Sequence, residues 1–216
     1  MLPQQEPVAK NKLLTIGGIL MLLFYTFQNF IPGIAFLPRP VALAITALIV
    51  VVSLLLFLPE LKRDVPAFFK NIREYSRFFF PKFGIFFVVY YLVAFTITLI
   101  AQVPAANQAL LEQISLPLLA FSALLYAPVL EEVLYRGFLR RVMDDDSFFI
   151  IVSALIFGAI HMLHGGQTAA QYLYIIEYCM LGGFLAWIYV KSDNICVSML
   201  GHFCLNLVAF IPMLFI

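Results

Sequence analysis

Two adjacent glutamates near the middle of the chain have the spacing of an ion pair with a second carboxylate beside it. Glu132 and Arg136 are four residues apart, so on a helix they share one face and can pair. Glu131 is rotated by about 100° from Glu132 on the same helix and can point elsewhere. An unpaired carboxylate next to a neutralised one suits a general base. The alternative is a salt-bridged helix end, which fits Glu132 and Arg136 better than it fits Glu131.

Two later segments carry side chains that could complete such a site. His161 ends a Phe157-x-x-x-His161 motif, and His202 and Asn206 are four apart and share one helix face. The ordinary role of these groups is hydrogen bonding between membrane helices. Alternatively, their N–H groups point into a common cavity.

The composition indicates where such helices lie. Of 216 residues, 63% are hydrophobic and 12% are charged, and the mean hydropathy is +1.00. So apolar a chain cannot cover a water-facing globule and is expected in a bilayer. A net charge of +1 gives no field for binding nucleic acid. The three cysteines form neither a disulfide framework nor a CxxC site, and we expect them to be packing residues: Cys179, Cys196 and Cys204.

The sequence predicts an all-α polytopic bundle with an intramembrane polar cavity. A helix needs about 20 mostly apolar residues to cross the hydrocarbon core. Seven segments (six to eight, given the long fourth one) meet this need: 13–34, 41–58, 83–101, 115–139, 148–163, 169–190 and 195–215. The first is expected to be a retained anchor, because its apolar stretch exceeds that of a signal peptide.

Basic residues predict the orientation. With a cytoplasmic N-terminus, every Lys and Arg except Arg39 falls on the inner side, as the positive-inside rule requires. We therefore expect a multi-pass protein of the cell membrane, of the prokaryotic cytoplasmic type. Segment 62–82 mixes basic and apolar residues at helical spacing and is expected to lie on the inner membrane surface.

The rise per residue of a helix predicts that the polar groups of the three motifs lie at similar depths in the membrane. At 1.5 Å per residue, Glu131, His161, His202 and Asn206 lie about 12–22 Å from the inner boundary. This is the middle or inner half of a core roughly 30 Å thick. Polar groups from three helices at similar depth predict a buried chamber that holds water.

Together the three motifs resemble the CPBP intramembrane proteases, which comprise CAAX prenyl endopeptidases and bacteriocin-processing or self-immunity (Abi) proteins. The resemblance covers about 113–213, so we divide a single membrane domain into N-terminal helices, 1–112, and catalytic helices, 113–216. It implies a helical bundle with a conical cavity and a prokaryotic Rce-type glutamate protease. By position, Glu131 and His161 would activate water.

The resemblance also assigns the remaining motif residues. His202 and Asn206 would stabilise the oxyanion, and Glu132 and Arg136 would support them. A metal-free mechanism is favoured because HExxH is absent. A zinc site of Glu131, His161 and His202 stays open, since one carboxylate and two histidines can ligate zinc. No serine or cysteine accompanies the histidines in a recognisable nucleophile motif.

Glu177 lies in the sixth span outside all three motifs, and we expect it to bond to Gln171 or to a tyrosine such as Tyr174. The alternative is that it shapes a polar path for the substrate. Three functions remain open. The first is an endopeptidase that acts on a membrane-associated or amphipathic peptide, in bacteriocin processing or self-immunity. The second is a non-catalytic protein of the same fold that binds a bacteriocin or a sensor kinase. The third is a proton-coupled transporter. Inverted repeats in the sequence would favour this function, but none is evident. The sequence gives no oligomeric state.

Overall fold

The computed structural model describes the whole chain except residues 1, 4, 31–37, 106–113, 164–167 and 216. All regular secondary structure within the described residues is helical. The last residues of the first expected span, 31–34, and the expected boundary between 112 and 113 lie outside the described residues.

Each expected span corresponds to a helix or to a run of helical segments. The elements are α1 (Lys12–Phe30), α2 (Arg39–Leu56), α3 (Leu58–Lys70), α4 (Ile72–Ala101), α6 (Leu116–Phe121), η2 (Ser122–Tyr126), α7 (Ala127–Glu132), η3 (Val133–Phe138), α8 (Leu139–Val142), α9 (Asp146–His161), η4 (Gln171–Tyr174), α10 (Ile175–Ser192), α11 (Ile195–Phe210) and η5 (Ile211–Phe215). Segments α6 to α8 form one continuous rod, in which η2 and η3 are π-helical turns.

Four of these helices are long and apolar enough to cross a membrane: Ile72–Ala101, Leu116–Val142, Gln171–Ser192 and Ile195–Phe215. A fifth span results if α2 and α3, which meet at a bend of 73°, are counted as one. Within the described residues, the apolar parts of α1 and α9 are shorter than these candidate spans. The expected fold class is confirmed: the chain is a multi-pass helical membrane bundle.

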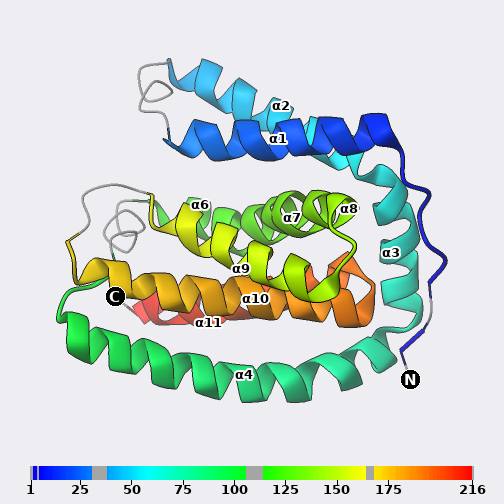
Figure 1. Cartoon of the computed structure of the whole chain (residues 1–216). Coiled ribbons are helices and arrows are strands. Elements are labelled where there is room, and N and C mark those ends of the chain that lie inside the picture. The colour runs from blue at the N-terminus through cyan, green and yellow to red at the C-terminus, as the bar shows by residue number, and fades with distance from the viewer. Residues whose placement is uncertain (1, 4, 31–37, 106–113, 164–167, 216) are drawn as a thin grey trace.

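The helices lie roughly side by side (Figure 1). The pair α1 and α2 covers one side, the long helix α4 covers the other, and the rod α6–α8 lies between them with α9, α10 and α11. Helix α3 runs across one end of the bundle, beside the N-terminal segment, while the C-terminus lies at the opposite end. The segment expected as one interfacial helix, 62–82, is divided at Asn71 between α3 and the start of α4.

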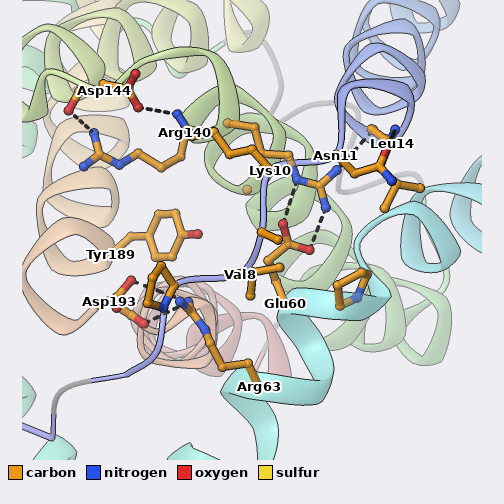
Figure 2. Close-up of a pocket in the computed structure, with 15 residues that line it drawn as sticks. Val8, Lys10, Asn11, Leu14, Glu60, Arg63, Arg140, Asp144, Tyr189 and Asp193 are labelled. Atoms are coloured by element: carbon orange, nitrogen blue, oxygen red, sulfur yellow. Dashed lines mark hydrogen bonds and ion pairs between the residues drawn. The ribbon is translucent and has the colours of Figure 1, made fainter.

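Polar contacts tie α3 and the N-terminal segment to this end of the bundle (Figure 2). Arg141 binds both carboxylate oxygens of Glu60, at 2.7 and 2.6 Å. Asp64 accepts a hydrogen bond of 2.8 Å from the backbone N–H of Ile195, at the start of α11. Lys10 pairs with Asp144. These contacts fix the end of α8 and the start of α11. They therefore also fix the positions, along the bundle axis, of the polar groups on these helical segments.

Helices α9 and α10 pack at very short distance because glycines face the contact. A Cβ atom on Gly182 would lie 2.7 Å from the Cβ of Phe157 and 3.1 Å from the Cα of Ala154. A Cβ on Gly158 would meet the sulfur of Cys179 at 2.3 Å. Small residues at such crossings let helix backbones approach closely. The approach brings Phe157 and the Gly182 carbonyl against the site described below.

We predict that Gly182→Ala destabilises the bundle while the neighbouring Gly183→Ala does not. The added methyl at 182 meets atoms close to the backbone, which cannot move aside, and overpacking of this kind costs about 1–3 kcal/mol. At Gly183 the new Cβ meets only the Cβ of Ala154, at 3.4 Å, an ordinary contact. The free energy of unfolding in detergent micelles measures both variants. Equal stability of the two variants would contradict the close packing of α9 on α10.

Candidate active site

A cavity of ≈ 590 Å³ lies inside the bundle, and four polar side chains from three helical segments line it. They are Glu131 of α7, His161 of α9, and His202 and Asn206 of α11. Much of the remaining lining is aromatic: Tyr25, Tyr90, Tyr91, Tyr126, Phe157, Tyr178 and Phe210. The four side chains that the sequence predicts to converge line this one cavity, and their catalytic roles stay a prediction.

The carboxylate of Glu132 does not line this cavity, and it accepts hydrogen bonds from three side chains of two helical segments, η3 and α11. Its Oε1 is 3.0 Å from Nη1 of Arg136 and 2.9 Å from Nδ1 of His202. Its Oε2 is 2.5 Å from Oγ of Ser198. The side chains of Glu132 and Arg136 are fully buried. A buried carboxylate with this many donors stays charged and holds its partners in fixed positions.

Arg136 contacts three helical segments through its two terminal nitrogens and its guanidinium plane, while its buried Nε has no partner within the described residues. The predicted ion pair with Glu132 forms, and Nη2 donates to the carbonyl of Gly182 at 3.2 Å. The guanidinium carbon lies 4.4 Å from the centre of the Phe157 ring, a cation–π contact. Arg136 thus joins the rod α6–α8 to α9 and α10 and neutralises Glu132 without reaching the cavity.

The contact with Glu132 determines which ring nitrogen of His202 carries a hydrogen. A carboxylate only accepts, so Nδ1 of His202 carries a hydrogen and Nε2 is the nitrogen left on the other side of the ring. In a neutral ring Nε2 bears a lone pair, and it becomes a donor only when the ring is an imidazolium. The expectation that His202 donates to an oxyanion therefore holds only for its protonated form.

Glu131 and His161 line the cavity, whereas Glu132 and Arg136 do not. The Oε2 atom of Glu131 is buried and has no hydrogen-bond partner within the described residues. Nδ1 of His161 lies 2.9 Å from the carbonyl of Phe157, which can only accept, so Nδ1 carries the hydrogen. The His161 ring stacks on Tyr178, with centroids 4.7 Å apart. Glu131 is the carboxylate that the site leaves unpaired, as its position beside Glu132 indicates.

Asn206 is oriented by an irregular turn that Pro128 explains. The N–H of Ala127 bonds to the carbonyl of Ser122, five residues earlier, and Pro128 has no N–H at all. The carbonyl of Ala123 is therefore left for a side chain, and Nδ2 of Asn206 donates to it at 2.7 Å. This bond fixes which end of the amide is nitrogen and leaves its second N–H for the cavity. Such π-turns often occur at functional sites.

The zinc alternative finds no ligand set in this geometry. Glu131, His161 and His202 line the same cavity, but within the described residues no three His, Cys, Asp or Glu side chains lie close enough together to hold a metal ion.

Ser198 and the tyrosines of the cavity are features that the motifs did not include. Ser198, His202 and Asn206 are spaced by four residues, so extending the motif by one turn toward the N-terminus would have found Ser198. The tyrosines come from α1, α4, η2 and α10, and no local pattern marks them as neighbours. Glu177 bonds to neither expected partner, because Gln171 donates to the Pro104 carbonyl and Tyr174 to the Val103 carbonyl.

Comparisons with known proteins agree with this geometry. Residues 113–208, which include all three motifs, match the family model described as type II CAAX prenyl endopeptidase Rce1-like. This segment, less than half of the chain, is therefore similar to the Rce1-like family. The Bacillus subtilis (strain 168) protein named "Putative membrane peptidase YdiL" is 26% identical over 104 residues, which are 46% of this chain and 39% of that relative. No solved structure matches the chain.

The Rce1-like segment includes both partners of the buried pair, and we predict that they depend on each other. Glu132→Gln should destabilise the protein by about 3–5 kcal/mol, because it leaves the charge of Arg136 buried without a counterion. The double variant Glu132→Gln with Arg136→Met should recover much of this loss. Unfolding of the two single variants and the double variant in the same detergent measures the coupling. Losses that simply add would contradict the pairing.

Proposed function

We propose that this Rce1-like protein is an intramembrane endopeptidase that hydrolyses peptide bonds with water activated by Glu131 and His161. The supporting observation is that Glu131, His161, His202 and Asn206, from three helical segments, line one cavity. The family match to CAAX prenyl endopeptidases supports the reaction class. The mechanism needs no covalent intermediate.

The reaction proceeds by addition and elimination. Glu131 accepts a proton from a water molecule, whose other hydrogen forms a hydrogen bond with Nε2 of His161, as the water oxygen attacks the carbonyl carbon of the peptide bond. The carbonyl oxygen becomes an oxyanion and receives hydrogen bonds from Nε2–H of protonated His202 and from the second N–H of Asn206. The carbon–nitrogen bond then breaks, and protonated Glu131 returns its proton to the leaving amine. The carboxylate of Glu131 is regenerated.

Donation from Nε2 to the oxyanion requires His202 to be an imidazolium. Glu132 and Arg136 cancel each other in the fully buried pair. An imidazolium at His202 then gives one positive charge, which the carboxylate of Glu131 balances across the cavity. A site with zero net charge costs least to bury in the membrane interior.

The substrate that we propose is a membrane-associated or amphipathic peptide. The aromatic lining of the cavity suits apolar side chains, and the bundle lies in a bilayer, where such peptides collect. We place the protein in the cell membrane with its N-terminus in the cytoplasm, as the basic residues favour. Bacteriocin processing or self-immunity is one setting for such a protease. The other partner is the lipid itself.

Glu131→Gln tests the proposal. The amide cannot take a proton from water, so hydrolysis should fall by at least 10²-fold, within the range that general bases contribute. The assay uses the purified full chain in lipid vesicles with a fluorogenic peptide library, and product masses locate the bond that is cut. Exposed Glu74, changed to Gln, is the matched control and should cleave at the wild-type rate.

Two outcomes would overturn the proposal. One is a Glu131→Gln variant that is folded and cleaves as fast as the wild type. The other is a wild-type protein that cleaves no peptide in the library yet binds one at the cavity, which would favour the non-catalytic binding function.

A further inference from the structure

A second pocket of ≈ 590 Å³ lies between the C-terminal half of α4 and the start of α10, with Glu177 in its wall. Glu177 is only 9% exposed, and its Oε1 has no hydrogen-bond partner within the described residues. Across residues 83–105 and 168–190, which include both helix faces, Glu177 is the only Asp, Glu, Lys, Arg or His. A carboxylate buried without a partner is costly, so its presence indicates a ligand.

The other polar groups of the pocket present acceptors rather than donors. The hydroxyl of Thr98 donates to the carbonyl of Ala94 at 3.0 Å, and that of Tyr174 donates to the carbonyl of Val103 at 2.8 Å. Both hydroxyl hydrogens are thereby used, and the oxygens offer lone pairs to the pocket. Within the described lining only the exposed amide of Gln102 keeps side-chain N–H groups. A ligand that fits such a wall brings its own donors and a positive charge.

The pocket adjoins the candidate active site along both of its helices. Glu177 directly precedes Tyr178, which lines the active-site cavity and stacks on His161. On α4, Tyr91 lines the active-site cavity and Thr98 lines the second pocket, seven residues or about 10 Å further along. An extended peptide covers this distance in about three residues. Tyr91 and Tyr178 line the active-site cavity, and the faces of tyrosine rings attract cations.

We propose that Glu177 forms a specificity subsite that binds a lysine or arginine side chain of the peptide substrate, about three residues from the bond that is cut. This inference rests on the proposed peptidase function. The substrate class is then an amphipathic peptide with a basic residue at a fixed distance from an apolar stretch.

Cleavage of matched peptides tests the subsite. Lysine and its uncharged analogue norleucine are placed in turn at each position within four residues of the bond that the wild-type protein cuts. The wild type should prefer lysine at one position, and Glu177→Gln should lower kcat/KM for that peptide by about 10- to 100-fold, the worth of a hydrogen bond to a charged group. The norleucine peptide should be cut equally well by both proteins. Exposed Glu74→Gln, which removes the same charge elsewhere, should keep the preference for lysine.

A binding measurement separates this inference from the peptidase function. Hexylammonium should raise the unfolding temperature of the wild type more than hexanol does, and Glu177→Gln should abolish that difference. If peptides are cut with no preference for lysine, or with a preference that Glu177→Gln leaves intact, the subsite is wrong while the peptidase stands. If no peptide is cut but the hexylammonium effect depends on Glu177, the cation site stands without the peptidase. If hexylammonium acts equally on both proteins, the cation site is wrong.

Discussion

The site depends on one buried carboxylate. Glu132 accepts hydrogen bonds from Arg136, His202 and Ser198, and the first two of these side chains also contact the ring of Phe157. Because the side chain of Glu132 is fully buried, none of these bonds can be exchanged for water. The orientation of His202 follows from this contact, and the neutrality of the pair with Arg136 allows the neighbouring Glu131 to remain available. Two adjacent glutamates thus have opposite tasks, one structural and one facing the cavity.

Departures from regular helix place the remaining groups. Pro128 and the π-turn before it expose the carbonyl of Ala123, and this carbonyl holds the Asn206 amide. The glycines between α9 and α10 bring Phe157 under Arg136 and supply the Gly182 carbonyl that the arginine also needs. Each feature weakens local packing or helix propensity by itself. Together they give a polar chamber within a bundle whose other residues are mostly apolar.

Much of this arrangement can be predicted from the sequence. The fold class follows from hydropathy, and the Glu132–Arg136 pair follows from a spacing of four residues, because both depend on local pattern. The convergence of His161 and His202 on Glu131 follows from depth along each helix. Contacts that depend on how one helix is rotated against another cannot be predicted from the sequence. The Nδ1 contact of His202 with Glu132 and the tyrosines of the cavity are of this kind, and Glu177 was expected to have a partner that the described residues do not give it.

The protonation of His202 is the most direct test of the account, because the whole site is arranged around its contact with Glu132. The chain has only three histidines, so nitrogen NMR of ¹⁵N-histidine-labelled protein in lipid vesicles, assigned by replacing each histidine, reports on each ring. The account predicts a hydrogen on Nδ1 of His202, and a changed Nδ1 signal when Glu132 is replaced by Gln. A His202 ring whose Nδ1 carries no hydrogen, or whose spectrum does not respond to Glu132→Gln, would contradict it.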